Sequence, residues 1–166
     1  MSRLFTRRRM IVAVGGATAM SPVALGATSA VAAPPSGTLI TLLTPLRIYD
    51  SRTDTTLLGG AKLVAGQAIT ITVAVPDEDR FLMAAFLNVT ITETEGAGFL
   101  RVNGTDSSGE RPVPITSNVN WSQDDQTLAN LVLTSVGSEA GVDIFAGGRG
   151  RTHVVVDVQG YVPFTG

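Results

Sequence analysis

The sequence predicts an all-β protein, an antiparallel two-sheet sandwich of about nine strands after a cleavable signal segment. Hydrophobic and polar residues alternate with a period of two over several short segments, and β-branched residues dominate those segments. Clusters of Gly, Asp, Asn and Ser separate the segments at the short spacing of jelly-roll and immunoglobulin-like sandwiches. No segment of useful length has a helical period.

The first residues have the order of a secretory signal. A basic head precedes an apolar run, and small residues ending in Ala-Val-Ala follow it. The head resembles a twin-arginine signal, with Arg7 and Arg8 as the pair. An uncleaved anchor is the alternative, but the apolar run has about 16 residues and a stable span needs about 20. We predict cleavage after Ala32, which gives a signal peptide over 1–32, a linker over 33–38 and a β-sandwich over 39–166.

Cleavage changes the charge balance. All 14 acidic residues follow the signal, whereas four of the 12 basic residues lie within it, so eight basic residues remain and the net charge becomes about −6. This charge disfavours nucleic acid and anionic membrane surfaces as partners, because both require basic patches. The absence of cysteine excludes thiol catalysis and thiolate metal sites. We expect a secreted, extracellular or cell-wall-associated protein with no stable membrane span after cleavage.

The strand candidates follow the linker in order. In the segment 69–75, Ile and Val occupy one face and Thr and Ala the other, as in a half-buried strand. The segments 83–92 and 153–158 alternate in the same way. Turn residues break the chain between candidates. The candidates are 39–43, 46–50, 69–75, 83–92, 98–102, 115–121, 128–136, 142–145 and 153–158.

Catalytic candidates are sparse. His153 is the single histidine, and Asp157 on the same strand lies about 13 Å from it in an extended chain, too far to pair. Ser51 is the one suggestive serine, but the sequence has no G-x-S-x-G motif, and we expect His153 at the surface as a strand-start residue. We therefore predict a protein without catalytic residues, with a secreted hydrolase as the weakest alternative.

Acidic residues offer two further alternatives. Glu93 and Glu95 share a face of a strand, as a glycosidase pair could, but aromatic residues to line a sugar site are few. The loops 77–79 and 106–110 carry oxygen donors suited to calcium, although neither matches an EF-hand loop, and calcium binding there stays open. We predict no metal site and no cofactor.

Polar residues inside strands are more informative, because asparagine is depleted in strands unless its amide is bonded. We predict an internal network in which arginine forks bind carboxylates and amides and fix the strand register. A ligand cleft built from the same groups is the alternative. In the network interpretation, Arg52→Ala destabilises the fold by a few kcal/mol because buried acceptors lose their partner. The members are Arg47, Asp50, Arg52, Asn118, Asn120, Asn130 and Asp157.

Six motifs in order resemble a family of secreted actinobacterial β domains. They are PLRIYDSR at 45–52, LNVT at 87–90, GFL at 98–100, SNVN at 117–120, ANLV at 129–132 and HVVVDVQGY at 153–161. The match covers most of the chain after the linker. Relatives often carry a cysteine pair in the second half, which this chain lacks. The resemblance implies an accessory, surface-exposed binding or structural domain with no established catalytic role.

We therefore expect an exported, non-enzymatic accessory domain that binds glycan or protein of the cell wall or extracellular space. Trp121 and Tyr49 are the candidate contact residues, because amphipathic rings are favoured at binding surfaces. The alternative is a structural subunit that forms a homo-oligomer through its sheet edges.

Overall fold

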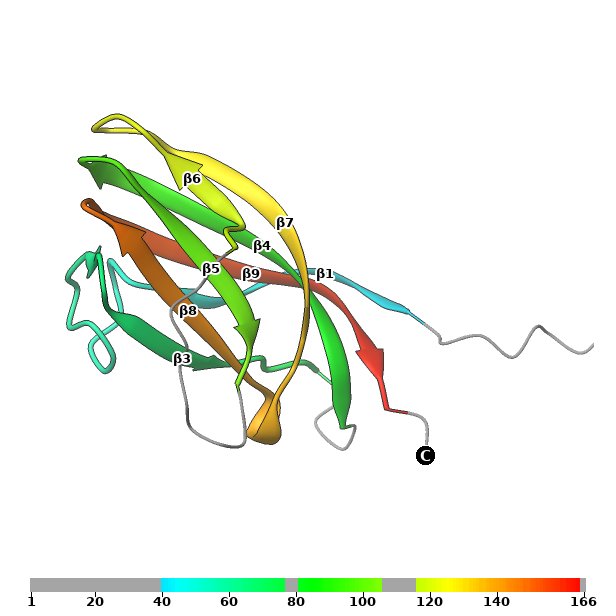
Figure 1. Ribbon diagram of the computed structural model, residues 1–166. Helices are drawn as coiled ribbons and strands as arrows, with labels where there is room; N and C mark the ends of the chain where they lie inside the picture. The colour runs from blue at the N-terminus through cyan, green and yellow to red at the C-terminus, as the bar shows by residue number, and fades with distance from the viewer. Residues whose placement is uncertain (1–39, 77–80, 106–115, 165–166) are drawn as a thin grey trace, which may run out of the picture. The chain divides into compact units, whose positions relative to one another are not determined.

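The computed structural model describes residues 40–76, 81–105 and 116–164, and these form two antiparallel sheets packed as a sandwich, which confirms the predicted fold class (Figure 1). Sheet A has the order β1 (Thr41–Asp50), β9 (Arg151–Pro163), β4 (Leu82–Glu95) and β7 (Leu128–Ser135), with β2 (Leu63–Val64) also paired to β9. Sheet B has the order β3 (Ala68–Thr72), β8 (Gly141–Gly148), β5 (Gly98–Gly104) and β6 (Val119–Trp121).

The last strand lies inside sheet A rather than at its edge. β9 pairs with β1 on one side and with β4 on the other, so the first and last strands of the domain are neighbours. This topology brings the segment 45–54 beside the segment 151–158. Residues at opposite ends of the sequence therefore share one surface.

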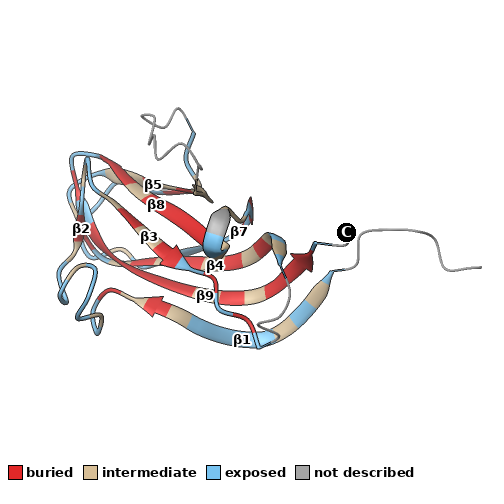
Figure 2. Ribbon diagram, turned by 90° about the horizontal axis from the view of Figure 1, so that it is seen from below, coloured by how far each residue is buried: buried red, intermediate tan, exposed pale blue. Residues whose placement is uncertain are grey.

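The core lies between the sheets and follows from the alternation in the sequence. Val154, Val156 and Val158 of β9 are fully buried, and so are Leu87, Val89 and Ile91 of β4. Sheet B contributes residues such as Leu100 and Ile144. Figure 2 shows burial over most of β8 and β9, in contrast to the exposed middle of β1. The unit Ser36–Gly166 is compact by itself and supplies this core, so we expect it to fold without the residues that precede it.

Several strand ends differ from the predicted bounds, as where β3 ends at Thr72 and β9 extends to Pro163, and three further differences change the elements themselves. The candidates 39–43 and 46–50 join into β1, which shifts register around Pro45 instead of ending there. The candidate 115–121 shortens to β6, and Ile115 lies outside the described residues. β2 was not predicted, because two residues carry no periodicity; it forms by pairing Leu63 with Thr152.

In the described parts of the chain, no helix is long and apolar enough to cross a membrane. The predicted signal with Arg7, Arg8 and Ala32, and the acidic loops 77–79 and 106–110, lie outside the described residues. Export, cleavage and calcium binding therefore stay predictions.

Candidate functional site

A row of charged and polar side chains lies on the outer face of sheet A, along β9. Alternation directs Arg151, His153 and Asp157 to this face, between β1 with its following loop on one side and β4 on the other. We call this group the polar strip. It consists of Arg47, Asp50, Arg52, Lys62, Glu93, Glu95, Arg151, His153 and Asp157.

One end of the polar strip is an arginine–aspartate cluster. Arg47 pairs with Asp157 across strands, Nε to Oδ1 at 2.9 Å, and reaches Asp50 at 3.4 Å. Arg52 binds Asp50 through two bonds, Nε–Oδ1 at 2.9 Å and Nη2–Oδ2 at 2.6 Å. The bonds from Arg52 hold the pKa of Asp50 below its usual value. This cluster links β1 to β9 at a fixed register.

The cluster corrects two sequence predictions. It is a surface cluster rather than an internal one, because the side chains of Arg47 and Arg52 are 52% and 42% exposed. Asp50 also keeps its contact with Arg47 and with the amide of Arg52 when the Arg52 guanidinium is absent. We therefore lower the expected loss for Arg52→Ala from a few kcal/mol to about 1 kcal/mol or less, as for other exposed ion pairs.

The strand asparagines belong to a different part of the molecule. Asn118 Oδ1 accepts the amide of Val102 at 2.7 Å, and Asn130 Nδ2 donates to the carbonyl of Asn118 at 2.7 Å. These bonds tie β5, the segment before β6, and β7 together on the far side of β4. Asn120 is exposed on β6. The predicted joining of arginines and asparagines in one network is thus wrong, although Asn118 and Asn130 do bond to backbone groups.

His153 of the polar strip forms a buried pair with Ser51, the residue that follows β1. Ser51 Oγ accepts the amide of Val154 and lies 2.9 Å from His153 Nδ1. Ser51 is fully buried and His153 is 8% exposed, so the expectation of a surface histidine is wrong. Burial, with the nearby cations Lys62 and Arg52, lowers the pKa of His153. In a neutral imidazole, Nδ1 accepts a hydrogen bond from the Ser51 hydroxyl, so the hydroxyl and Nδ1 are both paired.

This pair has the residue types of a hydrolase but not the geometry. In a serine triad, imidazole Nε2 faces the nucleophile and Nδ1 the acid. Here Nδ1 faces Ser51, and Nε2 lies 3.9 Å from Glu93 Oε2, beyond hydrogen-bonding distance. The hydroxyl has no exposed surface where a carbonyl could approach it. The pair therefore anchors the end of β1 to β9.

Glu93 and Glu95 both lie on the outer face of sheet A, but they contact different partners. The register between β4 and β9 shifts between Thr92 and Glu95, and Glu93 has a φ of 50°. The bulge sends Glu93 toward His153, whereas Glu95 binds Lys62 Nζ at 2.6 Å and also pairs with Arg151. These bonds lower the pKa of Glu95. The two carboxylates therefore share a face as expected, but Glu95 is held by two cations instead of facing an open site together with Glu93.

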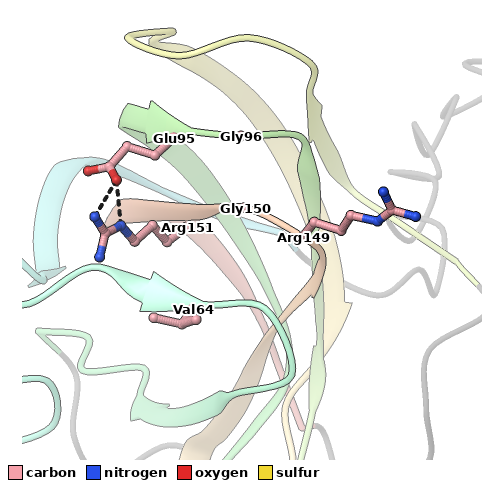
Figure 3. Close-up of a pocket in the computed structure, with 6 residues that line it drawn as sticks. All are labelled: Val64, Glu95, Gly96, Arg149, Gly150 and Arg151. Carbon is pink, nitrogen blue, oxygen red and sulfur yellow. Dashed lines mark hydrogen bonds and ion pairs between the residues drawn. The ribbon is translucent and has the colours of Figure 1, made fainter.

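A shallow depression of about 200 Å³ lies at the other end of the polar strip, lined by Val64, Glu95, Gly96, Arg149, Gly150 and Arg151. Figure 3 shows the ion pair of Glu95 and Arg151 on one side, while Arg149 points away from it. The Arg151 side chain is 55% exposed, and Val64 is 42% exposed. Sequence reasoning missed this site because its lining comes from three separated turns and strand ends.

The two predicted contact rings are not at the surface. Trp121 is 4% exposed and Tyr49 is 7% exposed, and both belong to the core. The indole fits a slot made by glycines: a Cβ at Gly150 would lie 2.9 Å from Trp121 Nε1, and one at Gly98 would lie 2.8 Å from Trp121 Cη2. Neither Tyr49 Oη nor Trp121 Nε1 has a hydrogen-bond partner among the described residues. The expectation that these two rings are exposed for contact is therefore wrong, and a binding role for them stays a prediction.

Asp54 stabilises the loop that follows β1. Its carboxylate accepts the amides of Thr56, Leu57 and Leu58, which organises the loop after β1. These bonds lower the pKa of Asp54 to about 2, the amide of Leu58 having the largest effect. Burial, with the nearby Asp54 and Asp50 carboxylates, raises the pKa of Tyr49 to about 12.

Within the described residues, no three His, Asp or Glu side chains come together as a metal-ligand set. No protein-family model and no curated protein matches the chain. The resemblance to secreted actinobacterial β domains therefore stays a prediction.

Proposed function

We propose that the protein is an exported, non-enzymatic binding domain for a glycan or protein of the cell wall or extracellular space. The supporting observation is the exposed Arg151 guanidinium, which Glu95 holds beside the depression and beside the apolar wall of Val64. Glu95 engages the Nε and Nη2 side of this guanidinium, and more than half of the side chain remains accessible.

The proposed partner carries carboxylate groups. A guanidinium offers several donors in a planar fork that matches a carboxylate. Because Glu95 already fixes the orientation of Arg151, binding orders fewer rotamers than binding to a free arginine would. Acidic glycans and acidic peptide segments both present such carboxylates, and Val64 adds apolar contact area at the same place.

A binding assay on insoluble polymers tests the proposal. The mature chain, residues 33–166, is incubated with insoluble peptidoglycan, chitin or cellulose, and the retained fraction is measured. We expect retention on peptidoglycan, weaker retention of Arg151→Ala, and unchanged retention of the control Arg101→Ala on β5. No retention on any polymer would reject the glycan form of the proposal. Equal retention of Arg151→Ala and Arg101→Ala would reject the site.

Export is the second part of the proposal and rests on the signal-like sequence at 1–32. Replacement of the arginine pair, Arg7→Lys with Arg8→Lys, should retain the protein inside the cell in unprocessed form. Normal secretion of that variant would reject the twin-arginine route.

A further inference from the structure

The free edge of β7 differs from every other sheet edge in the described residues. β7 lies at the end of sheet A and pairs with β4 alone, so one row of its backbone donors and acceptors has no strand partner there. Its pairing with β4 runs from Ser135 to Leu128 without a register shift. A long and regular edge of this kind is a template for another strand.

The other edge strands carry features that disfavour pairing, and β2 has only two residues. β1 contains Pro45, two register shifts and the charged Arg47. β3 directs no large apolar side chain outward, because Ile69 and Ile71 face the core. β6 has three residues. β7 has eight residues with neither proline nor charge.

β7 also differs from the other edge strands in its exposed apolar side chains. Leu131 and Leu133 point to the outer face of sheet A and are 56% and 60% exposed. Leu133 stands opposite Phe86 on β4, and Leu131 stands opposite Asn88. Solvent exposure of two large neighbouring leucines on an open edge is unfavourable and is relieved when a second apolar strand covers them.

Charge favours a second copy of the chain as that strand. The mature chain has acidic residues in excess, so two copies repel one another over most of their surface. β7 carries no charge, and its outer-face neighbours Ala84, Phe86, Asn88 and Thr90 on β4 carry none either. This edge is where two copies can approach without like charges opposite each other.

We propose that two copies associate by antiparallel pairing of their β7 strands across a two-fold axis at Val132. This register places Leu131 opposite Leu133 of the second copy, and the two-fold repeats the pair. The four leucines form one apolar cluster with Phe86 of each copy at its sides. Sheet A then continues through both copies, and the contact closes as a dimer because each copy uses the same edge.

The proposal goes beyond the binding function, because it uses a different surface and needs no ligand. Sedimentation velocity of the ligand-free mature chain over a wide concentration range tests it. We expect a monomer–dimer equilibrium that Leu131→Lys/Leu133→Lys shifts to monomer, because like charges would then lie opposite each other across the axis. The matched control is Leu42→Lys/Leu46→Lys, which changes exposed leucines on the β1 edge and should leave the dimer intact.

The register is tested by disulfide formation, which is unambiguous because the chain has no cysteine. Leu131→Cys/Leu133→Cys should give a cross-linked dimer on oxidation, whereas either single cysteine should cross-link far less, since residues directly opposite are close enough for a disulfide. Efficient cross-linking by a single cysteine would overturn the axis at Val132.

Three results would overturn the dimer itself. One is a wild-type chain that stays monomeric at every concentration. Another is a dimer that survives the β7 lysines but is lost with the β1 lysines. The third is a monomer whose β7 amides become protected from hydrogen exchange by an added extended peptide, which would assign the edge to a foreign strand.

Discussion

β1 and β7 lie at the two ends of the strand order in sheet A, and the two edges differ in regularity and in charge. β1 is irregular, carries Pro45, and is fastened to β9 by side chains such as Arg47 and Ser51. β7 is regular and uncharged, and the Asn130 side chain bonds to the carbonyl of Asn118, just before β6, rather than to β4. Native edges are blunted by the features that β1 has and β7 lacks. The comparison indicates that the β1 edge is protected from pairing with another strand, whereas the β7 edge is available for such pairing.

The largest expected effect on the free energy of unfolding comes from loss of the Ser51 contacts that hold β1 against β9. Ser51→Ala removes the acceptor of the Val154 amide and leaves His153 Nδ1 without its partner in a buried position. Each unsatisfied buried group costs about 1–3 kcal/mol, so for these two groups we expect a loss of about 2–6 kcal/mol in the free energy of unfolding. Urea denaturation followed by Trp121 fluorescence measures it.

Ser122→Ala is the control for this substitution, because Ser122 is exposed in the turn after β6. It should change the free energy of unfolding by less than about 0.5 kcal/mol. Equal stabilities of the two variants would show that β1 is not anchored through Ser51.

The second effect is a pH dependence of the same anchor. Burial lowers the pKa of His153 in the folded state, so the unfolded chain binds a proton at higher pH than the folded one. The contribution of neutral His153 to the free energy of unfolding is therefore fully present above the unfolded pKa of about 6.5. It declines as the pH falls below that value. Glu93 and Asp50, which also face the ring, oppose this shift, while Lys62 and Arg52 reinforce it.

Thermal unfolding between pH 8 and pH 5 measures this dependence. As His153 is the single histidine, His153→Gln should remove the slope in this range. The contribution of Asp54, whose pKa is lowered to about 2, is lost at lower pH and does not overlap with it. A slope that persists in His153→Gln would assign the titration to another group.

The sequence predicted most of the strands but not which strands pair with one another. β4 and β9 bury one face, and burial imposes an alternation that can be read directly. Ser51 and His153 are 102 residues apart, and they meet because β1 lies beside β9, which no local pattern encodes. Trp121 was expected at the surface because its slot depends on Gly98 and Gly150, which resemble ordinary turn glycines in the sequence.

A smaller effect is expected from the exposed ion pair of Arg47 and Asp157, which also links β1 to β9. In a double-mutant cycle of Arg47→Ala and Asp157→Ala, the coupling energy should be below about 1 kcal/mol, because the arginine side chain is half exposed and solvent screens the pair. Urea denaturation of the four proteins measures it, and the coupling should weaken with added salt. A coupling of several kcal/mol would mean that this pair, rather than Ser51, holds β1 in place.

The smallest effect is expected on β7, where neighbouring residues provide their own control. Leu133 is 60% exposed on the outer face, whereas Val132 is 3% exposed on the inner face. Measured on dilute monomer, Leu133→Thr should change the free energy of unfolding by about 0.5 kcal/mol or less. Val132→Thr places a hydroxyl in the core and should cost about 1–3 kcal/mol. If Leu133→Thr instead destabilised dilute monomer as much as Val132→Thr, the outer leucines would be serving the fold of one chain, and the contrast between a closed β1 edge and an open β7 edge would fail.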